Sequence, residues 1–249
     1  MTDIHSHILP GIDDGSPDLE ESLEMLAMAA DSGVETIVAT SHCNIPGVYD
    51  NYASPELNVL FRRLRSAARE EGIPIRIVRG MEVFATEDLT ELLRKQKLWT
   101  LGGTRNLLIE FSFEEDPDFC ADVLRDLKRT GTVPVIAHPE RYYFLQDDPQ
   151  LAFEWCTGGC ILQVNKGSIL GRFGSGPERC AHALLQHGLA ACVASDAHSA
   201  SARTTDMYEV RRALERDYGE EYAQLLLEEN PERILSGRDL LGFQPEPFL

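Results

Sequence analysis

The stretch Asp3-Ile4-His5-Ser6-His7-Ile8-Leu9-Pro10-Gly11-Ile12-Asp13-Asp14-Gly15 opens the chain with an apolar segment that carries paired polar groups. Its first part, Asp3–Ile8, has the length and composition of a buried strand. Successive side chains of a strand point to opposite faces, so His5 and His7 point the same way and can bind one metal ion together. Asp14 follows on the loop after this strand, where Asp14-Gly15 by itself indicates only a turn.

Apolar segments of this kind alternate with amphipathic segments along the whole chain. The further expected strands are Thr36–Thr40, Ile75–Val83, Leu107–Phe111, Val133–Ala137, Cys160–Val164 and Ala191–Ala194. Most are continuous apolar runs, which are typical of parallel strands buried on both faces. The expected helices are Asp18–Ser32, Pro55–Glu71, Thr86–Lys95, Pro117–Thr130, Pro149–Thr157, Pro177–His187, Thr204–Tyr218 and Glu220–Glu229. For the first helix we expect Ser16 as N-cap, Pro17 as first residue and Gly33 as terminator.

This series of seven expected strands, each followed by a helical segment, predicts an α/β protein with a closed or nearly closed barrel. An open, doubly wound sheet is the alternative. The length of 249 residues suits one such domain, residues 1–249, although length alone also permits two smaller domains. No repeat, linker or low-complexity stretch divides the sequence, so we expect a single domain.

The overall composition limits the classes of partner. The formal net charge is −18, which disfavours binding to nucleic acid or to anionic membranes. The first residues contain neither a basic region nor a long apolar run, so we expect no signal peptide and no membrane insertion. The six cysteines form no CxxC pair, and we expect reduced, mostly buried thiols in a cytoplasmic protein.

Metal-binding residue types recur where the expected strands end. Catalytic groups gather at the carboxyl ends of strands in folds of this kind. The candidate ligands are His5, His7, Asp14, His42, Glu82, Glu110, His138, Asp196 and His198. Each alone has an ordinary structural explanation, but unpaired polar groups on buried strands reduce stability, so the joint pattern favours a metal site. His182 and His187 lie on an expected helix, and we interpret them as structural.

The candidate ligands are too many for one tetrahedral ion and suit two or three divalent ions bridged by carboxylates. Imidazole and carboxylate ligands without thiolate fit Mn, Fe, Zn or Mg. Such ions lower the pKa of a bound water and neutralise phosphate oxygens. Arg141 and Arg203 closely follow His138 and His198, and both are suited to hold a phosphate by charge-assisted hydrogen bonds. The alternative for each arginine is a surface salt bridge.

Two other hydrolytic chemistries fit the sequence poorly. His42-Cys43 resembles the start of a cysteine-phosphatase loop, but Tyr49 stands where that loop needs an arginine. Amidohydrolases with a related histidine pair commonly need a carbamylated lysine at the end of a middle strand. Here that strand ends in Glu110, and Lys166 is the only lysine near a strand end.

The opening stretch resembles that of the bacterial CpsB/YwqE-type tyrosine-protein phosphatases of the PHP (polymerase and histidinol phosphatase) superfamily. The resemblance covers nearly the whole chain in order. It continues through Thr40-Ser41-His42, Gly80-Met81-Glu82, Ile109-Glu110-Phe111-Ser112, Ala137-His138-Pro139-Glu140-Arg141-Tyr142, Gln163-Val164-Asn165, Ala194-Ser195-Asp196-Ala197-His198 and Glu229-Asn230-Pro231. Departures at Cys43-Asn44 and Ser199 leave every candidate ligand in place and bear on substrate preference.

This resemblance implies a distorted (β/α)7 TIM-like barrel with three divalent metal ions, usually manganese, held by the nine candidate ligands. It implies phosphate binding by Arg141 and, by its offset, Arg203. The implied substrate is the tyrosine-rich tail of a bacterial tyrosine autokinase that controls capsule or exopolysaccharide export. Our hypothesis is direct phosphomonoester hydrolysis by a hydroxide that bridges two metals, with no phosphoenzyme. The candidate general acid is His42 or a metal-bound water.

Two alternatives remain open at this point. The first is another phosphoesterase of the superfamily, acting on histidinol phosphate or nucleic-acid ends, and the second is a non-catalytic metal-binding partner of a kinase. The acidic charge disfavours nucleic-acid substrates. A lost ligand would favour a non-catalytic protein, and none is lost from the candidate set.

Overall fold

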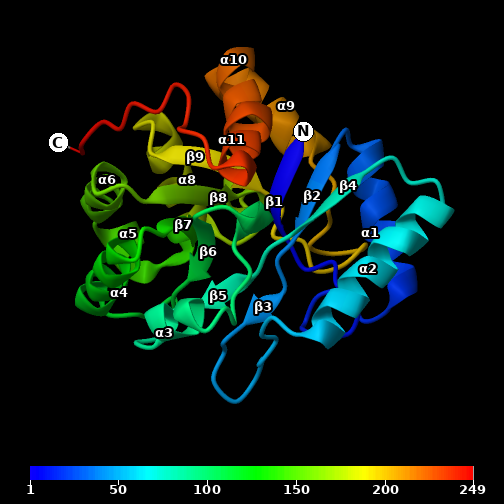
Figure 1. The fold of residues 1–249 in the computed structure, drawn as a ribbon. Helices are drawn as coiled ribbons and strands as arrows, with labels where there is room; N and C mark the ends of the chain where they lie inside the picture. Colours follow the sequence, from blue (N-terminus) through cyan, green and yellow to red (C-terminus); the bar gives the residue numbers. More distant parts are fainter. Residues whose placement is uncertain (249) are drawn as a thin grey trace.

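The computed structural model, which describes residues 1–248, is an α/β fold with two parallel sheets (Figure 1). The first sheet has the order β1-β2-β4, with β1 (Thr2–Ser6), β2 (Thr36–Ala39) and β4 (Arg76–Arg79). The second has the order β3-β5-β6-β7-β8-β9, with β3 (His42–Cys43), β5 (Glu82–Phe84), β6 (Asn106–Glu110), β7 (Val133–Ala137), β8 (Ile161–Asn165) and β9 (Ala190–Ala194). Every pairing within these sheets is parallel.

Helices connect the strands and cover the sheets. They are α1 (Leu19–Asp31), α2 (Pro55–Glu70), α3 (Leu89–Arg94), α4 (Pro117–Arg129), α5 (Tyr143–Asp147), α6 (Gln150–Thr157), α7 (Lys166–Ile169), α8 (Ser175–Gln186), α9 (Tyr208–Tyr218), α10 (Glu220–Gln224) and α11 (Asn230–Ser236). Two short 3₁₀ turns are η1 (Leu101–Gly103) and η2 (Pro139–Arg141), and a π-helical turn, η3 (Leu225–Glu229), joins α10 to α11. The described residues include no helix with the length and apolar character needed to cross a membrane.

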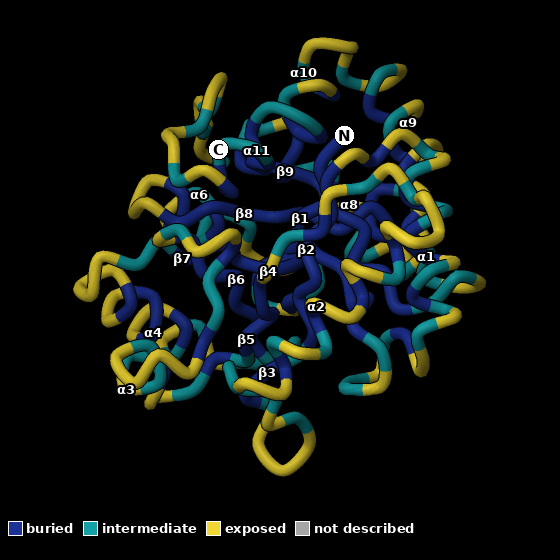
Figure 2. The backbone as a smooth tube through the Cα atoms, turned by 45° about the vertical axis from the view of Figure 1, so that its right-hand side comes forward, coloured by how far each residue is buried: buried dark blue, intermediate teal, exposed yellow. Residues whose placement is uncertain are grey.

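Most strands are buried on both faces, as their continuous apolar runs predicted, whereas Arg76 and Arg79 of β4 are exposed. In β6, Leu107 and Ile109 belong to a cluster shared with the covering helices. Leu108 between them belongs to a second cluster, together with Val135 of β7 and Ile234 of α11. Figure 2 shows the strands as the dark, buried centre of the molecule, whereas exposed residues lie on the helices and loops around them.

The expected strand Ile75–Val83 is interrupted at Gly80, and this prediction of one strand was wrong. Its two parts, β4 and β5, pair in different sheets. A Cβ atom at Gly80 would lie 2.8 Å from Cγ1 of Val38 and 3.0 Å from Cδ2 of Leu101, so close packing requires glycine here. A similar interruption separates β2, which ends at Ala39, from β3, which begins at His42 in the other sheet. The strands therefore form two separate hydrogen-bonded sheets, whereas the sequence predicted one closed or nearly closed ring.

The two sheets meet at β1 and β9. The N–H of Asp196 donates to the carbonyl of His5 (2.9 Å), and the N–H of His7 donates to the carbonyl of Ala197 (2.8 Å). This contact joins the first expected ligand pair to the last one. The ends of the chain's first and last strands therefore lie side by side.

Some predicted helix boundaries were wrong for local reasons. The N-cap of α1 is Asp18, whose carboxylate accepts from the N–H of Glu21, and the Ser16 hydroxyl donates instead to the carbonyl of Asp18. Helix α9 begins at Tyr208 and not at Thr204. The ammonium group of Lys166 binds the carbonyls of Thr204 and Asp206, which holds this segment in a non-helical conformation.

Candidate metal centre

The predicted ligands converge near the carboxyl ends of β1, β6, β7 and β9, whereas His42 and Glu82 are the first residues of the short strands β3 and β5. Three groups of side chains each place one ligand atom per residue within 4.8 Å of the others. The groups are His5, His7, Glu82 and Asp196; His7, Asp14, His42 and His198; and His42, Glu82 and Glu110. His7, His42 and Glu82 each belong to two groups, so the three groups form one continuous cluster.

The first group is fully buried. His5 Nε2 lies 3.1 Å from Oε1 of Glu82 and 3.4 Å from Oδ1 of Asp196. His7 Nε2 lies 3.2 Å from Oε2 of Glu82 and 3.3 Å from Nε2 of His5. Two imidazole nitrogens and two carboxylates therefore face one small volume, which is the donor set of a buried divalent ion.

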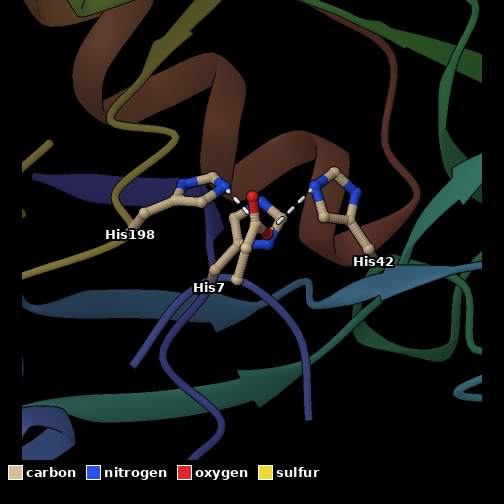
Figure 3. Close-up of side chains that lie close together, drawn as sticks. His7, His42 and His198 are labelled. Carbon is tan, nitrogen blue, oxygen red and sulfur yellow. Dashed lines mark ion pairs between the residues drawn. The ribbon is translucent and has the colours of Figure 1, made fainter. Parts of the chain in front are cut away.

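The second group surrounds Asp14. Its Oδ1 lies 3.5 Å from Nε2 of both His42 and His198, and Figure 3 shows these two imidazoles and that of His7 turned toward one another. The Asp14 side chain is 54% exposed, whereas the three histidines are mostly buried. This group therefore lies at the solvent-accessible mouth of the cluster.

The third group uses the other nitrogen of His42. His42 Nδ1 lies 3.0 Å from Oε2 of Glu82 and 2.9 Å from Oε1 of Glu110. His138 approaches the same carboxylates, with Nε2 at 2.9 Å from Oε1 of Glu82 and 3.9 Å from Oε2 of Glu110. His42 thus links the exposed second group to the buried carboxylates.

The geometry of these atoms fits bound cations better than hydrogen bonds. Among residues 1–248, His42 Nδ1, Glu82 Oε2 and Glu110 Oε1 are buried and lack a hydrogen-bond partner. The two carboxylate oxygens nevertheless lie 3.0 Å and 2.9 Å from His42 Nδ1. Buried polar atoms are normally hydrogen-bonded, and a shared metal ion is one of the few alternatives. The donor set is all nitrogen and oxygen, as divalent ions of the manganese and zinc kind require.

The ionisation of the carboxyl groups in the cluster also favours the binding of cations. Burial opposes ionisation of Glu82 and Asp196, yet the surrounding histidines hold the pKa of both carboxyl groups well below the usual range, and Arg203 also lowers that of Asp196. Burial alone would lower the pKa of His42, but the Glu82 and Glu110 carboxylates raise it to about 10. The carboxylates therefore remain ionised and favour cations in this place.

Two of the predicted ligands have strained backbones. His138 follows β7 with φ of 35°, and Asp196 follows β9 with φ of 50°. This left-handed region costs a residue other than glycine on the order of 1–3 kcal/mol. Such strain persists only where the surroundings stabilise it, and here it turns both side chains into the cluster.

Two polar residues that orient the histidines were missed by the sequence reasoning. Asp13 Oδ2 lies 2.9 Å from Nδ1 of His7 and accepts from the N–H of His42. Gln163 Oε1 lies 2.7 Å from Nδ1 of His5. Partners of this kind commonly fix the ring orientation of metal-binding histidines. The pair Asp13-Asp14 in the sequence was a signal for Asp13, because two adjacent carboxylates on a loop can bind different partners.

Both predicted arginines lie at the mouth of the cluster. Arg203 Nη2 is 2.5 Å from Oδ2 of Asp196, and Arg141 Nη1 is 3.6 Å from the same oxygen. Their side chains are 32% and 20% exposed, so an incoming anion can reach them. Two guanidinium groups beside a cluster of metal-type ligands form an arrangement suited to an oxyanion such as phosphate.

Other residues weighed from the sequence lie outside the cluster. Burial and then the Asp50 carboxylate raise the pKa of the buried Cys43 thiol to about 12, which disfavours it as a nucleophile. The Lys166 ammonium group binds backbone carbonyls and does not lie between ligands, so the carbamylated-lysine alternative lacks its key residue. His182 pairs with the Tyr218 hydroxyl, and His187 stacks on Phe248, in agreement with structural roles.

A family model described as "Capsular polysaccharide synthesis, CpsB/CapC" matches residues 1–236. The chain belongs to the CpsB/CapC family. Tyrosine-protein phosphatase YwqE of Bacillus subtilis is 34% identical over 247 residues, covering 99% of this chain and 96% of that protein. Tyrosine-protein phosphatase CpsB of Streptococcus pneumoniae is also 34% identical, over 242 residues, with 94% and 98% covered.

Solved structures agree with this CpsB/CapC assignment. A structure described as YwqE from Bacillus subtilis and CpsB from Streptococcus pneumoniae, "unique metal-dependent tyrosine phosphatases", superposes with a TM-score of 0.92 at 34% identity, and both chains are covered completely. The lactonase Lmo2620 from Listeria monocytogenes superposes with a TM-score of 0.63 at 14% identity, over 96% and 95% of the two chains. At that identity the second likeness concerns the fold alone.

Proposed function

We propose that this protein is a metal-dependent phosphomonoesterase that removes phosphate from phosphotyrosine in a protein substrate. One observation carries the proposal: two arginines converge on Asp196 Oδ2, while Oδ1 of the same carboxylate faces the buried histidines. A phosphate at this mouth would lie between the positive charge of the two arginines and that of metal ions held by the histidines. The tyrosine part of the proposal rests on the relatives, which are tyrosine-protein phosphatases by name.

The proposed ligands are the nine residues predicted from the sequence: His5, His7, Asp14, His42, Glu82, Glu110, His138, Asp196 and His198. The three overlapping groups favour three divalent ions, and we expect manganese, with Fe, Zn or Mg as alternatives. Bound ions of this kind supply a water of lowered pKa as nucleophile and positive charge for the phosphate oxygens. Asp13 and Gln163 would keep the ring nitrogens of His7 and His5 directed at the ions.

The chain's own groups would bind and orient the phosphate. Arg141 and Arg203 would exchange their contact with Asp196 for phosphate oxygens and hold them by charge-assisted hydrogen bonds. A phenolate with a pKa of about 10 is a fair leaving group, so little protonation is needed. The candidate proton donor remains His42, whose Nε2 lies at the exposed edge beside Asp14, or a metal-bound water.

The wider proposal concerns architecture and setting. We propose a single domain in which the two sheets together make the distorted (β/α)7 barrel expected from the sequence, supported by the hydrogen bonds between β1 and the residues after β9. The proposed substrate is the phosphotyrosine tail of a bacterial tyrosine kinase in capsule or exopolysaccharide production, supported by the family description. All six cysteines are buried free thiols, which supports a cytoplasmic setting.

A substrate comparison tests this function. The manganese-loaded protein is assayed with a phosphotyrosine peptide, the matching phosphoserine peptide, histidinol phosphate and a phosphorylated oligonucleotide. We expect the highest kcat/KM for phosphotyrosine, loss of activity after chelation and recovery with Mn²⁺. Full activity in metal-stripped protein contradicts the metal mechanism. A clear preference for histidinol phosphate or the oligonucleotide contradicts the proposed substrate, and no turnover with metals bound favours a non-catalytic partner.

A further inference from the structure

A partly buried phenylalanine lies beside both arginines of the mouth. The centroid of the Phe173 ring is 4.6 Å from Cζ of Arg141 and 5.9 Å from Cζ of Arg203. Phe173 belongs to the turn between α7 and α8, far in sequence from either arginine. A second ring, Phe113, lies 4.4 Å from Cζ of Arg141 only. Phe173 is thus the aromatic ring that the two arginines share.

The Phe173 ring packs directly against the backbone of Gly167. A Cβ atom at Gly167 would lie 2.5 Å from Cε2 and 2.8 Å from Cζ of Phe173, so the ring occupies space that only glycine leaves free. The turn is closed by hydrogen bonds from the N–H of Arg172 to the carbonyl of Gly167 and from that of Gly171 to Ser168. The ring position therefore follows from packing, and the ring is not a loosely attached surface side chain.

The ion pairs with Asp196 restrain the two guanidinium groups unequally, and that of Arg203 is close, with Nη2 2.5 Å from Oδ2. The ion pair of Arg141 with Asp196 is long, at 3.6 Å. Nε of Arg203 is buried and, within the described part of the chain, lacks a hydrogen-bond partner. A ring face attracts a guanidinium group without using any of its N–H donors, whereas an acidic partner would occupy them. An aromatic restraint therefore leaves the donors available for phosphate.

We infer that Phe173 is a positioning residue that holds Arg141 and Arg203 in the orientation in which they bind the substrate phosphate. The inference rests on the proposed phosphatase function. In this role the Phe173 ring acts on the substrate only through the two arginines and does not contact the substrate itself. Two like charges at one mouth repel each other, and the shared ring face offsets part of that repulsion.

Phosphate binding to the metal-loaded protein gives the first test. Phe173→Leu keeps apolar bulk but removes the aromatic face, and Phe248→Ala is the matched control, because Phe248 stacks on His187 away from the arginines. Titration calorimetry with inorganic phosphate should show a Kd about five- to tenfold higher for Phe173→Leu and unchanged for the control, with metal content unchanged in both. An unchanged Kd, or a loss of metal, overturns the inference.

Hydrolysis of two substrates separates an action through the arginines from direct stacking on the substrate. Phe173→Leu should lower kcat/KM by a similar factor for a phosphotyrosine peptide and for glycerol 2-phosphate, which has no ring. A loss confined to the phosphotyrosine peptide means that the ring contacts the substrate and overturns a positioning role. A wild-type protein that neither binds phosphate nor hydrolyses either ester contradicts the proposed function itself, whereas an active wild type with an unaffected variant contradicts only the inference.

Gly167 provides an independent variant that leaves both the ring and the arginines chemically intact. Gly167→Ala should displace the Phe173 ring and raise the Kd for phosphate. The same substitution in a Phe173→Ala background should have little further effect, because the ring it would displace is gone. Equal effects of Gly167→Ala in both backgrounds mean that Gly167 acts by another route, and they contradict the inference.

Discussion

Arg203 places Nη2 2.5 Å from Oδ2 of Asp196, and the other oxygen of that carboxylate faces His5. One side chain therefore separates the arginines from the histidine cluster. Asn165 also donates to Oδ2 (2.6 Å), which fixes the carboxylate between the two sides. Because Asp196 has φ of 50°, this position depends on the backbone turn after β9 and not on a flexible side chain.

Replacement of these arginines should weaken phosphate binding without loss of metal. We expect Arg141→Ala and Arg203→Ala each to lower kcat/KM for a phosphotyrosine peptide by about 10- to 100-fold, since each removes charge-assisted hydrogen bonds of about 1.5–3 kcal/mol. Arg216→Ala is the control, because Arg216 pairs with Asp217 on the surface. Steady-state kinetics with elemental analysis of metal content checks this, and normal activity of both variants would show that the arginines do not hold the phosphate.

His138 should be needed for metal retention. His138→Ala removes the imidazole 2.9 Å from Glu82 Oε1, and we expect at least one ion fewer per chain and loss of nearly all turnover. His182→Ala serves as the control, because His182 pairs with Tyr218 outside the cluster. Elemental analysis after dialysis measures the difference. Equal metal content in the two variants would remove His138 from the ligand set.

Asp13 should affect metal affinity through His7. Asp13→Ala leaves Nδ1 of His7 without its carboxylate partner, and loss of such a partner typically costs 10- to 100-fold in metal affinity. Competition with a chelator of known affinity measures the change, and activity should return at high Mn²⁺ concentration. If excess Mn²⁺ gives no recovery, the role of Asp13 lies elsewhere than in positioning His7.

Cys43 should be dispensable for turnover. Its thiol is buried, and its pKa, raised to about 12, keeps it protonated throughout the range of pH 6 to 9. Cys43→Ser should therefore retain activity, and iodoacetamide should inactivate the wild type slowly at every pH in this range. A folded but inactive Cys43→Ser variant, or alkylation that rises steeply near pH 7 together with inactivation, would support a cysteine nucleophile instead.

The sequence by itself determined the metal-type side chains at the ends of β1, β6, β7 and β9, whereas Glu82, expected at the end of a strand, begins β5. The period of two within a strand predicted that His5 and His7 share a face, and the apolar runs predicted strands buried on both sides, because both features depend on neighbouring residues. The order of strands and helices along the chain was also predictable, because it depends on the same local patterns. The structure places the predicted ligands at one end of the strands, with the two arginines beside them.

Only the tertiary structure decided the features that depend on distant residues. Packing against Val38 and Leu101 at Gly80 splits one expected strand between two sheets. Burial of Lys166 under the segment before α9 shifts the start of that helix. The contact of Phe173 with both arginines joins side chains from three segments far apart in the sequence. Such contacts arise when the chain closes on itself, because close packing and shared burial select them among many local conformations of similar free energy.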